Sequence, residues 1–417
     1  MFSANNFERI CRRIDAYRED MIKLQSELTA IPAISPASGG EGEIDKALFL
    51  EQAIRAMGFM DIARIDAPDT AAKSAIRPNI FASLKGQKQT PATWVLTHLD
   101  IVPPGEASLW EGDPYKAYVR DGRIYGRGVV DNQQDLVASL FAARAFLDEG
   151  IKPERTIGLA FVSDEEMGSK NGLAYLLDNP PHPFGKEDLI VVPDAGNEDG
   201  TMIEISEKSS LWLRFKTIGK QCHGSRPAQG NNAFLAASHL VVRLNDLHKI
   251  YSVEDELFDP PASTFQPTKK EANVPNINTI PGEDVFYIDC RTLPEYPLPQ
   301  IRETIRSMAD EIESAFGVVV EIEAVTQAQA APPTSFDAPV VRALQEAIRA
   351  IYGREAAPLG IGGGTVAAFF RRKGYPAAVW SRNTCTAHQP NENCLIEDMV
   401  GNAKVFAHVF LQDWQRS

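Results

Sequence analysis

The sequence predicts an α/β protein built on a doubly wound, mostly parallel sheet, with a smaller α+β unit inserted into it. Short runs of continuous apolar residues, separated by helical segments, indicate the sheet. Such runs are typical of parallel strands that helices cover on both faces. After about residue 208 the order of elements changes, which indicates the inserted unit. At 417 residues, the chain is long enough for two or three domains.

Four apolar runs are expected to form the parallel strands, and polar residues follow each run directly. The runs cover residues 94–97, 157–163, 189–193 and 377–380. The stretch 135–149 carries apolar residues at helical spacing and is expected to be a helix between two strands. A doubly wound sheet follows, and its functional side chains should lie at the carboxyl ends of the strands.

The inserted unit is expected to follow the order β-α-β-β-α-β. Its predicted elements are a strand at 211–218, a helix at 232–248, strands at 276–280 and 285–291, a helix at 299–316 and a strand at 318–325. This order is that of a ferredoxin-like unit. The polar stretch 254–271 is expected to be a long loop, and 328–335 a hinge. We therefore assign residues 1–207 and 326–417 to one discontinuous domain and 208–325 to an inserted domain.

The charge of the chain argues against nucleic-acid and membrane partners. There are 42 Lys and Arg against 56 Asp and Glu, which gives a net charge of -14, and basic residues do not cluster with aromatic ones. The N-terminus lacks an apolar segment, and we find no apolar run long enough to span a bilayer. Five scattered cysteines fit reduced thiols better than disulfides. A cytoplasmic location is expected.

His98 and Asp100 follow the first apolar run, in the sequence T-H-L-D. Because they are two residues apart at a strand end, both side chains can face the same side. A carboxylate placed in this way fixes the tautomer of an imidazole that binds a metal ion. Taken alone, the triplet is as consistent with a surface or structural role.

Further candidate metal ligands follow in order along the chain. They are Asp131 in G-R-G-V-V-D-N, Glu165 and Glu166 in S-D-E-E-M-G-S, Asp194 in V-P-D-A-G and His388 in T-A-H-Q-P-N-E. Each alone has an ordinary alternative, a helix N-cap for Asp131 and turn positions for the other carboxylates. Together with His98 they form a mixed nitrogen and oxygen set that suits zinc or a similar divalent ion. Of two adjacent glutamates, one could bind the metal and the other could move the proton of a water molecule.

This ordered set of motifs resembles the zinc-peptidase family that contains aminoacylase, acetylornithine deacetylase, succinyl-diaminopimelate desuccinylase and bacterial glutamate carboxypeptidase. The resemblance covers essentially the whole chain and implies two divalent metal ions, zinc first, with cobalt or manganese as alternatives. It implies that His98 and Asp194 bind one ion. Glu166 and His388 would bind the other, and Asp131 would bridge the two.

The resemblance also assigns roles to the residues around the metal ligands. Glu165 would be the general base and then the general acid. Asp100 would orient His98. The peptide bond between Asp131 and Asn132 is expected to be cis.

Three residues of the inserted unit match further motifs of the family. His223, in G-K-Q-C-H-G-S-R-P, resembles the histidine that reaches across a homodimer and stabilises the oxyanion in the partner's site. Asn278 in N-T-I-P-G-E and Arg291 in D-C-R-T resemble the family's substrate-binding pair, in which the arginine would hold a substrate carboxylate. The alternatives are a histidine on a lid surface and a strand arginine in a salt bridge.

Two segments depart from the family pattern. Asn132, Gln133 and Gln134 stand where acidic and basic residues often follow Asp131 in the family. The glycine-rich segment 362–368, which contains Gly363 and Gly364, lacks the Asp and Arg that many deacetylases have there. Both segments are expected to line the substrate pocket, so the acyl group and side chain that bind remain open.

The sequence therefore predicts a two-metal amidohydrolase acting on an N-acyl amino acid, as deacetylases and desuccinylases do. The alternative is a dipeptidase or carboxypeptidase acting on short peptides. The substrate would be a small amide or short peptide with a carboxylate, and the enzyme a homodimer through the inserted unit. A non-catalytic metal-binding homologue would be expected to lack Glu165 or a ligand, and this chain has them all. A serine-hydrolase G-x-S-x-G motif is absent from the sequence.

Overall fold

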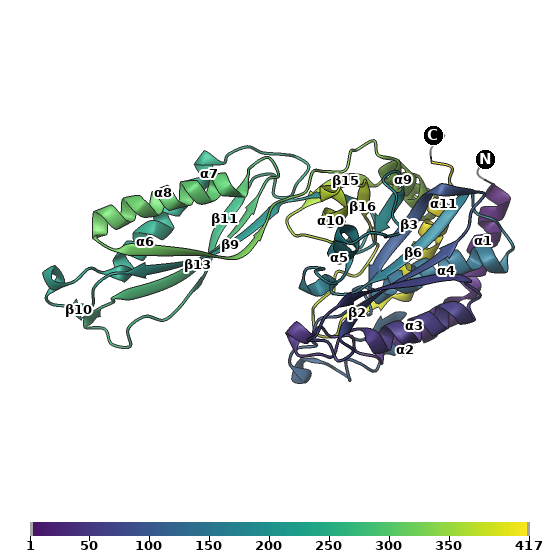
Figure 1. The fold of residues 1–417 in the computed structure, drawn as a ribbon, viewed down its shortest axis with the longest axis horizontal. Coiled ribbons are helices and arrows are strands. Elements are labelled where there is room, and N and C mark those ends of the chain that lie inside the picture. Colours follow the sequence, from purple (N-terminus) through teal and green to yellow (C-terminus); the bar gives the residue numbers. More distant parts are fainter. Residues whose placement is uncertain (1–2, 415–417) are drawn as a thin grey trace. The chain divides into compact units, whose positions relative to one another are not determined.

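Residues 3–414 of the chain are described by a computed structural model, and they fall into two units (Figure 1). The larger unit comprises Met1–Ile205, Pro333–Leu359 and Thr365–Ser417, and the smaller unit comprises Ser206–Pro332 and Gly360–Gly364. The smaller unit is thus formed from two separate stretches of the chain. Within residues 3–414, no helix has both the length and the apolar character needed to cross a membrane.

The larger unit contains an eight-stranded sheet. In order across the sheet, its strands are β1 (Asp61–Pro68), β2 (Ile76–Leu84), β6 (Arg155–Val162), β3 (Lys88–His98), β7 (Leu189–Val192), β16 (Ala377–Val379), β8 (Met202–Glu207) and β15 (Ala357–Ile361). The central strands β6, β3, β7 and β16 are parallel, whereas β1, β2 and β8 pair in antiparallel fashion. The four apolar runs form the four parallel strands, so the predicted doubly wound sheet is confirmed.

Helices cover both faces of this sheet because successive side chains of the parallel strands point to opposite faces. Trp94 and Leu96 of β3 join one cluster with residues of α5 and α10. On the other face, α4 packs against β3 and β6. The helices of the larger unit are α1 (Ala4–Ala16), α2 (Arg18–Thr29), α3 (Ile44–Ala56), α4 (Gln133–Asp148), α5 (Leu173–Asp178), α9 (Pro339–Tyr352), α10 (Ala367–Arg372) and α11 (Ile396–Leu411).

Two features next to the central sheet position the candidate site. The predicted helix at 135–149 is α4, which begins two residues earlier and follows Asn132 as its N-cap. A small three-stranded sheet in the order β17 (Asn393–Leu395), β5 (Arg123–Tyr125) and β4 (Tyr118–Arg120) joins two distant parts of the chain. The segments that carry Asp131 and His388 therefore meet next to this small sheet.

The smaller unit contains a four-stranded antiparallel sheet in the order β11-β13-β9-β14. Its elements in chain order are β9 (Ser209–Ile218), α6 (Ala233–Leu244), α7 (Leu247–Ile250), β11 (Thr264–Lys270), β13 (Glu283–Thr292), α8 (Leu298–Phe316) and β14 (Val319–Ala328). In chain order, β9 is the first strand of this unit, and the second and third, β11 and β13, both lie on the same side of it. This is the ferredoxin-like arrangement. The predicted α+β insert is confirmed.

The prediction for the second strand of this unit was wrong. Residues 264–270 were expected to be in a loop but form β11, of which only Phe265 is buried. The expected strand at 276–280 contributes only β12 (Thr279–Ile280), which pairs with β10 (Cys222–His223) in a separate sheet. Because β11 is an edge strand with exposed polar residues, its sequence lacks the apolar pattern of a buried strand.

The core of the smaller unit lies between its sheet and its two long helices. Phe215 of β9 and Phe286 of β13 stack in parallel there, with ring centroids 4.6 Å apart. Both side chains are buried, together with Leu240 of α6 and Ile305 of α8. The stacked pair therefore joins the two central strands to the helices.

We expect Phe215→Ala to destabilise the smaller unit by about 3–5 kcal/mol, because it removes a buried ring and leaves a cavity. Hydrogen exchange of peptides from residues 209–328 at increasing denaturant concentration measures this change locally. Val325→Ala, on the exposed side of β14, is the control and should change the stability by less than about 0.5 kcal/mol. Equal effects of the two substitutions would contradict this description of the core.

Candidate metal centre

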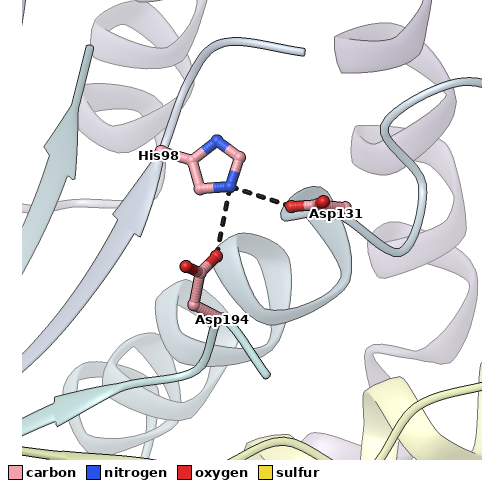
Figure 2. Close-up of side chains that lie close together, drawn as sticks. All are labelled: His98, Asp131 and Asp194. Atoms are coloured by element: carbon pink, nitrogen blue, oxygen red, sulfur yellow. Dashed lines mark hydrogen bonds and ion pairs between the residues drawn. The ribbon is translucent and has the colours of Figure 1, made fainter. Parts of the chain in front are cut away.

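His98, at the end of β3, is held between one backbone carbonyl and two carboxylates, and Figure 2 shows the two carboxylates. Its Nδ1 lies 3.0 Å from the backbone oxygen of Asp100, which can only accept a hydrogen bond. We therefore assign the proton to Nδ1. Its Nε2 lies 2.9 Å from Oδ1 of Asp131 and 3.3 Å from Oδ1 of Asp194. These three side chains form one group that could hold a metal ion.

His388 forms a second such group on the other side of Asp131. Its Nε2 lies 3.1 Å from Oδ2 of Asp131 and 3.0 Å from Oε2 of Glu166. Asp131, Glu166 and His388 could together hold a metal ion. Each oxygen of Asp131 thus faces a different histidine, so Asp131 belongs to both groups.

The surplus of negative charge at these two groups shifts several pKa values. Hydrogen bonds to Asp131 and Glu166 raise the pKa of His388 to about 10. Burial lowers the pKa of His98, but hydrogen bonds to Asp100, Asp131 and Asp194 raise it well above its usual value. Burial raises the pKa of Glu166 to about 7. A site that favours protonated histidines in this way also favours a divalent cation, and its imidazole and carboxylate donors suit such an ion.

Asp100 connects His98 to the two adjacent glutamates. Its carboxylate accepts hydrogen bonds from the backbone N–H groups of Glu165 and Glu166, both at 3.0 Å. The two glutamates form a short 3-10 helix that ends at Met167. Burial, together with the negative charge of Asp194, raises the pKa of Glu165 well above its usual value. Asp100 therefore fixes the imidazole through its carbonyl and the glutamate segment through its carboxylate.

The peptide bond between Asp131 and Asn132 is cis, as expected. The side-chain nitrogen of Asn132 donates to the carbonyl of Pro193 at 2.6 Å and lies 3.5 Å from Oδ1 of Asp194. Asn132 thus connects the segment that carries Asp131 to the end of β7.

The prediction that Gln133 and Gln134 line a substrate pocket was wrong. Both side chains are buried in the first turn of α4. Gln133 accepts a hydrogen bond from the hydroxyl of Thr29 at 2.8 Å, and Gln134 donates to the carbonyl of Arg382 at 2.8 Å. Their role in the structure is to fix the start of the helix.

Glu392 is a residue of the site that the sequence analysis missed. It is fully buried, and its carboxylate accepts hydrogen bonds from the backbone N–H groups of Gly128 at 3.0 Å, Val130 at 2.9 Å and Asp131 at 3.1 Å. Arg127 donates to the same carboxylate at 2.7 Å. The segment that leads to Asp131 is therefore held around one carboxylate. Apart from Arg127, its partners are backbone groups, so the only sequence signal is its place four residues after His388.

His223 and Asn278 lie together in the smaller unit, on the two-stranded sheet of β10 and β12. The backbone N–H of Gly224 donates to the carbonyl of Asn278 at 2.7 Å, and His223 pairs with Thr279. The exposed ring of His223 accepts a hydrogen bond at Nδ1 from the backbone N–H of Ser225 at 3.1 Å. Because Nδ1 accepts, the neutral ring carries its proton on Nε2, which can donate to another group.

β13 begins at Glu283, shortly after β12 in the chain. Arg291 lies near the opposite end of β13, about 27 Å along the strand from Glu283. Its Nε and Nη2 donate to the two oxygens of Asp289 at 2.7 and 3.1 Å, so the salt bridge considered from the sequence is present. Its Nη1 donates to the carbonyl of Gly362 at 3.2 Å. Gly363 and Gly364 follow, and a Cβ atom at either position would meet open space. Within one chain, Arg291 and Asn278 do not form a pair.

Comparisons with known proteins agree with this centre. Over 94% of its length the chain is 39% identical to an uncharacterized metallohydrolase of Methanococcus maripaludis, of which it covers 98%. It is 27% identical to succinyl-diaminopimelate desuccinylase 1 of Ruegeria sp., over 90% of this chain and 93% of that one. The fold matches human carnosine dipeptidase 1 over the full length of both chains, with a TM-score of 0.75 and 18% identity.

The family model that matches is described as peptidase family M20/M25/M40, and the match covers residues 94–412. This span includes all the candidate metal ligands and the whole smaller unit. With its metallohydrolase and desuccinylase relatives, it makes the chain a metal-dependent hydrolase of C–N bonds. The chain belongs to peptidase family M20/M25/M40.

Proposed function

We propose that this hydrolase cleaves the amide bond of a small N-acyl amino acid, and that it uses two metal ions. The observation that carries the proposal is the pair of ligand groups that share Asp131, with Glu165 next to them. The desuccinylase relatives, which by their name remove an acyl group, favour this substrate class over a peptide. Arg291 would then bind the substrate carboxylate.

His98, Asp131 and Asp194 would hold one ion, and Asp131, Glu166 and His388 the other. The mixed imidazole and carboxylate donors favour zinc, with cobalt or manganese as alternatives. Two such ions would polarise the scissile carbonyl and ease deprotonation of the attacking water. Asp100 would keep His98 in the tautomer that directs Nε2 to the ion.

Glu165 would take the proton from the attacking water and deliver it to the nitrogen of the leaving amine. Two features support this role: its backbone is fixed by Asp100, and its raised pKa suits a group that must both accept and release a proton. Its neighbour Glu166 would act as a ligand, so the two glutamates would divide the two tasks.

The smaller unit would supply the groups that bind the substrate. Nε2–H of His223 would donate to the developing oxyanion, with Asn278 next to it. Arg291 uses one edge of its guanidinium for Asp289, which leaves N–H groups of Nη1 and Nη2 for a substrate carboxylate. Gly363 and Gly364 would border the same carboxylate site.

A homodimer would allow His223 of one chain and Arg291 of the other to act on the same substrate. In one chain, His223 and Arg291 lie at opposite ends of the smaller unit's sheet, which supports donation of His223 to the site of a second copy. The second copy would pack on α6 and β11. Phe234, Leu235 and Val242 of α6 are apolar and exposed, and β11 has an unpaired edge that can extend the sheet between two chains.

The first test is a substrate screen of the zinc-, cobalt- and manganese-loaded protein. We expect release of the free amine from N-acetyl or N-succinyl amino acids. Matched substrates with an amidated carboxyl group should react poorly, because they cannot pair with Arg291. Cleavage of dipeptides without cleavage of any N-acyl amino acid would identify a peptidase instead. Full activity of metal-free protein would contradict the use of metal ions.

The second test concerns Glu165. Glu165→Gln should keep both metal ions but lower kcat by about 10²- to 10⁴-fold, because the amide cannot accept the proton. Metal analysis and kinetics on the best substrate of the screen measure the two effects. Glu187→Gln, an exposed position, is the matched control. Loss of metal, or a kcat close to that of the control, would show that Glu165 has another role.

The third test asks whether His223 acts in the partner's site. Glu165→Gln and His223→Ala are each expected to be inactive, but a mixed dimer has one site with an intact Glu165 and a His223 from the partner. After subunit exchange, activity should return to about a quarter of the wild-type value. A mixture of Glu165→Gln with the Glu165→Gln/His223→Ala double variant should stay inactive. If exchange is demonstrated by native mass spectrometry and no activity returns, His223 does not act in the partner's site.

A further inference from the structure

The segment from Ser163 to Gly172, which carries Glu165 and Glu166, is attached to the neighbouring strand β2 by side-chain hydrogen bonds. Asn79 of β2 is fully buried and accepts from the backbone N–H of Ser163 at 3.1 Å. It also donates to the carbonyl of Asn171 at 3.1 Å. The hydroxyl of Ser163 donates to the carbonyl of Pro78 at 2.6 Å. Asn79 therefore binds the start and the end of the segment at the same time.

Arg77 holds the residue that directly precedes Glu165. Its Nη2 lies 3.1 Å from Oδ1 of Asp164, and both side chains are buried. The other oxygen of Asp164 accepts from the backbone and side-chain nitrogens of Asn171, at 2.9 and 3.0 Å. Asp164 has a φ of +65°, so the backbone turns sharply there, and the paired carboxylate keeps that turn in place.

Arg77 is itself fixed from another side. It forms a buried two-point ion pair with Glu43, and its Nη1 lies 3.2 Å from Oδ2 of Asp69. Arg77 and Asn79 are two residues apart on β2, so their side chains leave the strand on the same side. The glutamate segment is thus attached to a rigid part of the sheet and not to another loop.

Gly172 brings the two ends of the segment into direct contact. A Cβ atom at this position would lie 1.9 Å from the carbonyl oxygen of Ser163, so only glycine fits. The segment is therefore a closed loop that carries Glu165 and Glu166 between its two anchored ends.

We propose that Arg77 and Asn79 are positioning residues that set the place of the Glu165 carboxylate without contacting substrate or metal. This inference rests on the proposed role of Glu165. A displacement of about 1 Å at a reacting group can cost about 10²-fold in rate, so a loop that carries a general base needs such anchors. Asp100 fixes the backbone of Glu165 from one side, and the Arg77–Asp164 and Asn79 contacts fix it from the other.

The test compares Asn79→Ala and Arg77→Lys with Asp69→Asn. The lysine keeps the charge but cannot reach Glu43 and Asp164 together, whereas the Asp69 variant weakens another partner of Arg77 and leaves the anchors intact. We expect the first two variants to lower kcat about 10- to 100-fold with KM and bound metal unchanged. Their amides at residues 163–171 should exchange faster in metal-free protein. Asp69→Asn should match the wild type in all four measurements.

Two outcomes would overturn the inference. One is a kcat and an exchange rate equal to those of Asp69→Asn. The other is a joint change in which bound metal and thermal stability fall and KM rises, which would mean that the anchors only support the fold. Asn171→Ala, which removes the side-chain donor to Asp164 and keeps the backbone donor, tests the same contacts if the Arg77 variant does not fold. Because the exchange measurement needs no substrate, a failed role for Glu165 would appear separately, as an active Glu165→Gln.

Discussion

The shared carboxylate of Asp131 is the constraint on which the rest of the larger unit depends. Both histidines of the centre face it, at 2.9 and 3.1 Å, so a small movement of Asp131 would disturb both ligand groups. The negative charges of Glu166 and Glu392 lie close enough to Asp131 to repel it. Buried cations nearby reduce this repulsion: Arg127 pairs with Glu392, and Lys46 lies in the field of Asp100 and Glu392.

Three of the segments that carry candidate ligands are fixed by a buried acid or amide that binds backbone groups. Glu392 holds three N–H groups leading to Asp131, Asp100 holds those of Glu165 and Glu166, and Asn132 holds the carbonyl of Pro193 before Asp194. A buried carboxylate that accepts several N–H bonds is satisfied only in one arrangement of the chain. The ligands can therefore be brought together before any ion binds.

The sequence predicted the parts of the molecule that depend on residue type and spacing. The four parallel strands are continuous apolar runs because both of their faces are covered, and three of the candidate ligands, His98, Glu166 and Asp194, follow such runs. The prediction failed at β11, where only Phe265 is buried. It also failed for Gln133 and Gln134, whose polar side chains find hydrogen-bond partners inside the larger unit. Glu392 and Asn79 were missed for a related reason: apart from Arg127, their partners are backbone groups, which every residue has, so no motif marks these contacts.

The same reasoning explains why the reaction class follows from this protein more readily than its substrate. The candidate metal ligands and Glu165 belong to the larger unit, where the ligand atoms of each group lie within 4.8 Å of one another. In the proposed function, recognition of the substrate would depend on the smaller unit, where Asp289 engages one edge of Arg291 and the glycines at 363 and 364 present no side chain that could select an acyl group by shape. Partial neutralisation of Arg291 would lower its attraction for any single carboxylate, so selectivity would have to come from the size and polarity of what enters beside it. The two glycines would keep that space open.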